Sequence, residues 1–146
     1  LKGISNKPEY QVIETERFCK AHGIKRPVPN PHFPVNSLKI MRGAVFARDK
    51  DYYAPYIDTI YSAMWEQALK MDEDDIITQV LNDAGLPADE IIEGMTQPEV
   101  KQGLIASTEA SVHRGTFGSP TLFVGDEIFF GKDKLRDALE LAQQNA

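Results

Sequence analysis

The chain has 146 residues, of which 42% are hydrophobic, a length and composition that suit one folded domain with an apolar core. Its 16 basic and 22 acidic residues give a net charge of −6, which argues against nucleic acid as a partner, because phosphate binding needs a basic face. No apolar run approaches membrane-spanning length, and the lone Cys19 excludes an internal disulfide or C-x-x-C motif within these residues. We therefore expect a cytoplasmic protein that binds neither nucleic acid nor membranes, and the spacing of its three histidines predicts no metal site.

The first quarter of the chain predicts two helices joined by a proline-rich loop. Pro8 can open a helix over 8–22, and Gly23 can cap its end. Residues 25–34 contain four prolines and indicate an extended loop. Asn36 or Ser37 can cap the next helix, whose apolar face carries Leu38, Met41, Val45 and Phe46.

Helices also dominate the middle of the chain. Residues 52–71 give the clearest helical pattern, and Tyr61, Met64 and Trp65 are expected to pack in the core. Further helices are expected from the acidic 72–75 segment to Gly85, over 87–94, and from a capping box at 96–99 to Arg114. The apolar residues of the 52–71 stripe are Ile57, Ile60, Tyr61, Met64, Trp65, Ala68 and Leu69.

The last 32 residues predict two short strands and a final helix. Ser119-Pro120 leads into the first strand, Gly125-Asp126 forms a tight hairpin turn, and a helix runs over 132–144. A lone hairpin is marginal in water, so the sequence also predicts that these strands pair with others that this chain does not obviously supply.

The segment GTFGSPTLFVGDEIFFGKD (115–133) resembles the 2-hydroxychromene-2-carboxylate isomerases and kappa-class glutathione transferases of the DsbA-like group. Weaker matches at 32–38 and 10–23 follow the same family order. The resemblance implies an α/β, thioredoxin-like fold of the DsbA/kappa type. It implies a single domain over 1–146, with a large helical insertion over about 8–114 and a strand–strand–helix unit over about 115–146. It also implies that a strand–helix–strand unit with the reactive serine precedes this region and that the loop between Lys7 and Pro8 is short. The catalytic residue is therefore unknown from these residues.

The resemblance assigns glutathione as the cofactor and places its binding at two segments. A cis bond at Ser119-Pro120 would let the backbone of Ser119 pair with the cysteinyl part of glutathione. The segment Phe130, Gly131, Lys132 and Asp133 would bind the γ-glutamyl end, with open amides on its carboxylate and Asp133 on its ammonium group. The alternatives are an ordinary trans proline at a strand entrance and an ordinary helix start.

Three residues are expected to face a small aromatic substrate. By the resemblance these are Asn6, Lys7 and Val35, against the alternatives of a polar terminal loop and a helix entry.

The function implied is that of a glutathione-dependent isomerase. The thiolate would add to the conjugated ring system, permit rotation about the opened double bond, and leave again. A kappa-like transferase, a DsbA-type thiol-disulfide oxidoreductase and a non-catalytic binding domain remain alternatives. Family members are often dimers, so a homodimer is expected.

Overall fold

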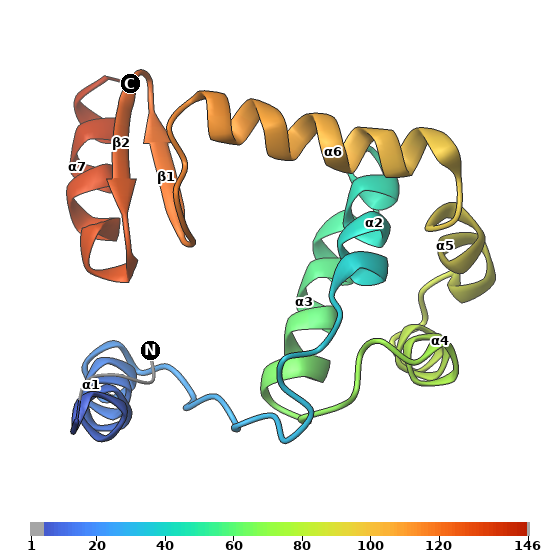
Figure 1. Ribbon diagram of the computed structural model, residues 1–146, viewed down its shortest axis with the longest axis horizontal. Helices are drawn as coiled ribbons and strands as arrows, with labels where there is room; N and C mark the ends of the chain where they lie inside the picture. Colours follow the sequence, from blue (N-terminus) through green and yellow to red (C-terminus); the bar gives the residue numbers. More distant parts are fainter. Residues whose placement is uncertain (1–4, 146) are drawn as a thin grey trace. The chain divides into compact units, whose positions relative to one another are not determined.

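The computed structural model describes residues 5–145 and divides the chain into two compact units, Leu1–Met95 and Thr96–Ala146 (Figure 1). That the two units form a single domain over 1–146 stays a prediction. None of the helices in the described range combines the length and hydropathy that a bilayer crossing requires.

Among residues 5–95 the regular elements of the first unit are all helices. It contains α1 (Lys7–His22), α2 (Leu38–Ala47), α3 (Tyr53–Trp65), α4 (Asp74–Asp83) and α5 (Ala88–Gly94). Gly23 ends α1 in the left-handed conformation at φ 64°, and its amide donates to the carbonyl of Cys19, as its predicted capping role requires. Gly85 follows α4 with φ +70°, as expected for a residue that ends a helix.

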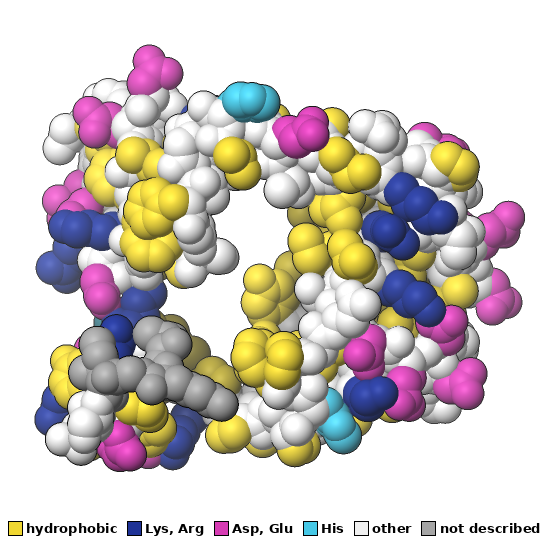
Figure 2. Space-filling model, in the orientation of Figure 1, with side chains coloured by type: hydrophobic (Ala, Val, Ile, Leu, Met, Phe, Trp, Pro, Cys, Tyr) yellow, Lys and Arg dark blue, Asp and Glu magenta, His cyan; other side chains and the backbone are white. Residues whose placement is uncertain are grey.

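The core of this unit lies among α2, α3, α4 and α5. Helix α2 packs on α3 and α5, and α4 packs on the same two helices. The largest fully buried side chains are Tyr56, Met71, Ile77, Leu81 and Ile91. Figure 2 shows hydrophobic side chains gathered over α2 and α3, and acidic side chains over α4 and α5. The amphipathic pattern of the sequence therefore closes one apolar interior and leaves charged side chains of both signs on the outer face.

Helix α3 is shorter than its sequence pattern predicts. It ends at Trp65 rather than at residue 71, and Ala68 takes a positive φ of 57° that no helix contains. The buried side chain of Asn30 explains the end, because its Nδ2 donates to the carbonyls of Met64 at 3.1 Å and Leu69 at 2.9 Å. These bonds satisfy carbonyls that lose their helical partners.

The predicted core stripe of α3 is wrong for Tyr61. This side chain is 63% exposed, whereas Tyr56 is fully buried in the same helix. Met64 is buried and Trp65 half-buried, as the stripe predicts. The apolar periodicity of this segment fits either tyrosine on the buried face, so the pattern alone does not show which of Tyr56 and Tyr61 is buried.

Residues 24–37 form the expected extended loop before α2. The amide of Val28 donates to the carbonyl of Trp65 at 2.6 Å, which ties the loop to the end of α3. The bond Phe33-Pro34 is cis, which the sequence did not indicate. Ser37 occupies the N-cap position of α2 without a side-chain cap bond. Asn36 lies one residue before the cap, and its Oδ1 accepts from the amide of Leu38, the first residue of α2, at 3.2 Å.

The second unit joins one long helix to a hairpin and a final helix. It contains α6 (Pro98–His113), β1 (Thr121–Val124), β2 (Glu127–Phe130), the 3₁₀ helix η1 (Lys132–Lys134) and α7 (Leu135–Gln144). Strands β1 and β2 are antiparallel, with Val124 opposite Glu127, so Gly125-Asp126 is the predicted two-residue turn. Helix α7 packs on both strands (Figure 1).

Two boundaries in this unit differ from prediction. Helix α6 begins at Pro98 with Gln97 as N-cap, so Thr96 does not occupy the cap position that the 96–99 box predicts. The final helix begins with a separate 3₁₀ turn rather than running unbroken from residue 132. Short 3₁₀ segments of this kind are common at helix starts.

Candidate functional site

The entrance to β1 carries the first predicted site residues. The Ser119-Pro120 bond is cis, which confirms the predicted backbone geometry, and both residues are exposed. The carbonyl of Pro120 accepts from the amide of Gly131 at 2.9 Å. Because Thr121 pairs with Phe130 in the hairpin, the two predicted segments meet at one end of the sheet. The structure thus brings together Ser119, Pro120, Phe130 and Gly131; their role toward a ligand stays a prediction.

An aromatic pair borders this hairpin end. The rings of Phe117 and Phe130 lie 4.6 Å apart between centroids, and Phe117 is 74% exposed. A Cβ added to Gly118 would lie 2.8 Å from Cε2 of Phe130, so glycine is what lets this ring lie so close to the backbone. The sequence analysis did not single out Phe117, although it lies within the segment 115–133 that carries the resemblance.

The second predicted segment, 130–133, contains a glycine that no other residue replaces easily. Gly131 has φ 92° and ψ 158°, a conformation almost confined to glycine. The carboxylate of Asp133 is exposed, and Nζ of Lys132 lies 2.5 Å from its Oδ1. This ion pair places a cation beside the group predicted to hold the ammonium of glutathione.

The three predicted substrate residues lie in the first unit and are not brought to one place. Asn6 is the N-cap of α1 with φ 67°, and Lys7 is the first helical residue. Val35 is half-buried and lines an apolar pocket of about 370 Å³ to which neither Asn6 nor Lys7 contributes. The full lining of this apolar pocket is Phe33, Val35, Ser37, Ile40, Met41, Ala44, Tyr56, Ile57, Ile60, Tyr61, Met64 and Trp65.

The apolar pocket has no charged side chain in its lining. Burial raises the pKa of Tyr56, and its hydroxyl donates to the carbonyl of Ile40 at 2.7 Å, so this phenol stays neutral and already has an acceptor. The rings of Phe33 and Trp65 lie 5.9 Å apart and tilted by 45°. Of the residues named in the sequence analysis for substrate binding, Val35 alone lines the pocket; the periodicity of α3 pointed to Trp65 only as core.

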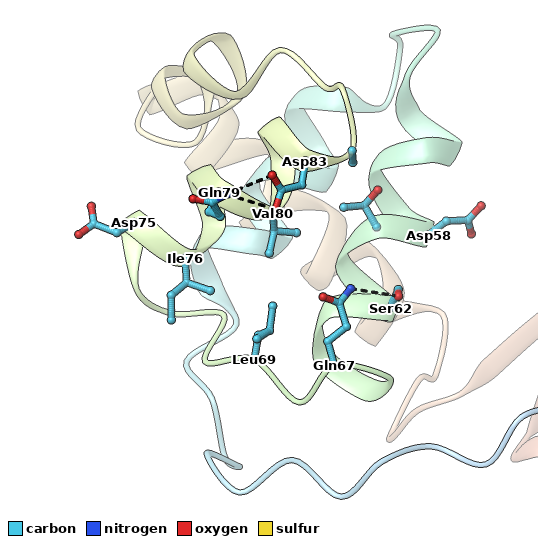
Figure 3. Close-up of a pocket in the computed structure, with 11 residues that line it drawn as sticks. Asp58, Ser62, Gln67, Leu69, Asp75, Ile76, Gln79, Val80 and Asp83 are labelled. Carbon is cyan, nitrogen blue, oxygen red and sulfur yellow. Dashed lines mark hydrogen bonds between the residues drawn. The ribbon is translucent and has the colours of Figure 1, made fainter.

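A second, larger pocket of about 700 Å³ lies between α3 and α4 (Figure 3). Leu69, Ile76 and Val80 give it an apolar base, and Asp58 and Asp75 stand on opposite sides with their carboxylates directed outward. Both carboxylate oxygens of Asp83 accept from Nε2 of Gln79, one turn earlier in α4, at 3.0 and 3.2 Å. None of the predicted site residues lines this pocket.

Within residues 5–145 no three His, Cys, Asp or Glu side chains are arranged to hold an ion. Cys19 is a buried residue of α1, which fits a structural role.

Comparison with known proteins places this geometry in a family. Residues 4–142 match the DSBA-like thioredoxin domain, which is nearly the whole chain. The chain belongs to this family. The predicted α/β, thioredoxin-like fold class is thereby confirmed, and so is the resemblance to the DsbA-like group.

Individual proteins that are similar to this chain carry more specific names. The chain is 23% identical over 129 residues to a 2-hydroxychromene-2-carboxylate isomerase of Pseudomonas putida, covering 88% of this chain and 62% of that protein. It is 30% identical over 97 residues to a protein of the same name from Sphingobium xenophagum, covering 66% and 49%. A solved 2-hydroxychromene-2-carboxylate isomerase superposes with a TM-score of 0.79 at 24% identity, over 98% of this chain and 71% of that one. The chain thus spans 62% and 49% of the length of these two curated relatives, less than two thirds of either.

Proposed function

We propose that this chain belongs to a glutathione-dependent isomerase that acts on a small aromatic substrate, in the manner of 2-hydroxychromene-2-carboxylate isomerase. The observation that carries the proposal is the match to isomerases of that name along 88% of the chain. The fold alone would support several activities, because one fold hosts many functions. The arrangement of the hairpin end and of the apolar pocket adds support from the residues themselves.

The hairpin end fits a thiol tripeptide. Ser119 is exposed beside the cis bond and can offer its backbone to an extended ligand as an added strand would. Gly131 has no side chain that would block a ligand from the neighbouring backbone. Asp133 is exposed and can accept from an ammonium group in a charge-assisted bond, sharing its carboxylate with Lys132.

When bound, glutathione supplies the thiol that reacts. This chain's own residues hold the tripeptide by backbone and carboxylate, and orient it; orientation is a large part of the rate that an enzyme provides. The apolar pocket around Val35 offers a water-poor surface for an aromatic ring.

The proposal is tested by isomerisation of a 2-hydroxychromene-2-carboxylate, followed by its change in ultraviolet absorbance, with the protein at its full natural length. We expect turnover that depends on added glutathione. Asp133→Asn should raise the KM for glutathione about tenfold or more, because bonds to charged groups contribute about 1.5–3 kcal/mol. The matched control Asp58→Asn, at the rim of the α3–α4 pocket, should leave this KM unchanged. Absence of turnover with thiol present would count against the isomerase.

Two other activities use the same fold and are separated by parallel assays. A kappa-like transferase would release a stable glutathione conjugate of an aryl halide. A thiol-disulfide oxidoreductase, which membership of the DSBA-like family favours, would reduce insulin disulfides without any chromene turnover.

The proposal retains two expectations from the sequence. A homodimer would show as twice the monomer mass in light scattering. A cytoplasmic location, favoured by the lone cysteine, would show in cell fractionation.

A further inference from the structure

We propose that Ser37 is a specificity-determining residue of the apolar pocket, where its hydroxyl pairs with a hydroxyl on an uncharged aromatic ring while any carboxylate of the ligand stays outside. This inference rests on the proposed function, since it names the part of the substrate that the pocket takes.

The lining of the pocket decides the charge of what enters. Twelve residues form it, and none of them is acidic or basic. An ionised carboxylate moved into such surroundings loses its hydration and gains no partner, so it would enter protonated or not at all. The ring system of a substrate can enter, whereas its carboxylate remains in water.

The walls suit a flat ring. Phe33 and Trp65 meet at a tilt of 45°, and Phe33 and Tyr61 are each 63% exposed, so aromatic faces stand open at this pocket. Aromatic pairs contribute beyond the area that they bury when the rings stack with an offset or meet edge to face. A volume of about 370 Å³ lies within the ordinary range of ligand pockets.

Two side chains of the lining, Ser37 and Tyr61, retain both a donor and an acceptor for a ligand, and Ser37 is the less exposed of the two, since Tyr61 is 63% exposed. The hydroxyl of Tyr56 already donates to the carbonyl of Ile40, and the indole of Trp65 can only donate. Ser37 makes no side-chain cap bond to α2. Its hydroxyl donates to the sulfur of Met41 at 3.4 Å, and thioether sulfur is a weak acceptor.

The experiment measures binding of three naphthalene compounds without glutathione: naphthalene, β-naphthol and β-naphthoate. Calorimetry gives the dissociation constants, and the emission of Trp65, the sole tryptophan of the chain, shows whether binding occurs in this pocket. The variants are Ser37→Ala and Ala44→Leu, which fills the pocket. Their matched controls are Ser107→Ala on α6 and Ala84→Leu in the α3–α4 pocket.

We expect β-naphthol to bind more tightly than naphthalene, and β-naphthoate at least tenfold more weakly than β-naphthol. Ser37→Ala should weaken β-naphthol about three- to tenfold and leave naphthalene unchanged, as the loss of one hydrogen bond requires. Ala44→Leu should weaken both, and the two controls neither. Equal binding of naphthol and naphthoate, or an equal effect of Ser37→Ala on naphthol and naphthalene, would overturn the inference.

The failure of this inference and that of the proposed function look different. Selective naphthol binding without isomerase turnover retains the role of Ser37 and removes the isomerase. Isomerase turnover, together with a Ser37→Ala variant that binds and reacts like the natural protein, retains the isomerase and removes the role of Ser37.

Discussion

The contact between Tyr56 and α2 gives a stability prediction that can be worked from the structure. Tyr56→Phe removes the hydroxyl that donates to the carbonyl of Ile40 at 2.7 Å and keeps the fully buried ring. Because Ile40 lies inside α2, its carbonyl also faces the amide four residues on and is not left without a donor. The free energy of unfolding should therefore fall by about 1 kcal/mol, the net contribution of one hydrogen bond.

Gly43 lies beside this contact, and the structure predicts the sign of the stability change that Gly43→Ala causes. Glycine to alanine inside a helix ordinarily stabilises by about 0.5–1 kcal/mol. Here an added Cβ would lie 2.1 Å from the hydroxyl of Tyr56 and 2.6 Å from Cε of Met95. Gly43→Ala should instead destabilise, by about 1–3 kcal/mol, as overpacking does. In the double variant with Tyr56→Phe, Gly43→Ala should destabilise less, because the tyrosine hydroxyl, the atom nearest to the added Cβ, is gone. Some destabilisation should remain, because Cζ of the ring still lies 2.7 Å from that Cβ.

Urea unfolding followed by the emission of Trp65 measures all of these variants, since Trp65 belongs to the same unit as the contact. Tyr53→Phe, on a 38% exposed tyrosine of the same helix, is the matched control and should change stability by less than about 0.5 kcal/mol. A Gly43→Ala protein that unfolds at higher urea, or free-energy changes that simply add in the double variant, would refute the packing described here.

Four further predictions follow from other contacts. Asn30→Ala should destabilise by about 2–3 kcal/mol, because two carbonyls lose a buried donor, whereas Asn82→Ala on the exposed end of α4 should not; the same urea titration measures both. Gly131→Ala should cost about 1–3 kcal/mol from its backbone conformation, seen as faster hydrogen exchange in β1 and β2, and unchanged exchange would contradict it. Hydrogen bonds from Lys50 and Tyr52 lower the pKa of Glu90. The stability that Glu90 contributes is therefore present above the ordinary glutamate pKa and is lost as the pH falls through the lowered value. In a plot of the urea midpoint against pH, Glu90→Gln should make the fall at acid pH less steep. Asp133→Asn should weaken glutathione binding in calorimetry about tenfold or more, and an unchanged dissociation constant would remove this carboxylate from the site.

The sequence predicts well wherever one or two residues decide the local backbone. Gly125-Asp126 between two apolar runs determines the hairpin register, and that register brings Pro120 opposite Gly131. Gly23 and Gly85 end their helices as expected. The resemblance at 115–133 pointed to the cis bond at Ser119, which residue types alone leave open.

The sequence predicts poorly where a distant side chain decides. The apolar period of α3 continues past Trp65, but Asn30, more than thirty residues earlier, binds the carbonyls at its end and allows the chain to turn. No local pattern contains that information, because the two segments meet only in the folded unit. The same limit hid the apolar pocket, since Phe33 and Trp65 come from a loop and a helix that sequence patterns treat separately.

The buried amide of Asn30 has a consequence for recognition as well as for stability. Its Oδ1 accepts from the backbone amide of His32 at 2.9 Å, while its Nδ2 holds the last turn of α3. One carboxamide thus joins the loop that carries Phe33 to the helix that carries Trp65, the two rings that a bound aromatic would touch. The backbone segments that carry the two rings are therefore held together without a ligand, which lowers the free energy that binding would otherwise spend on ordering them.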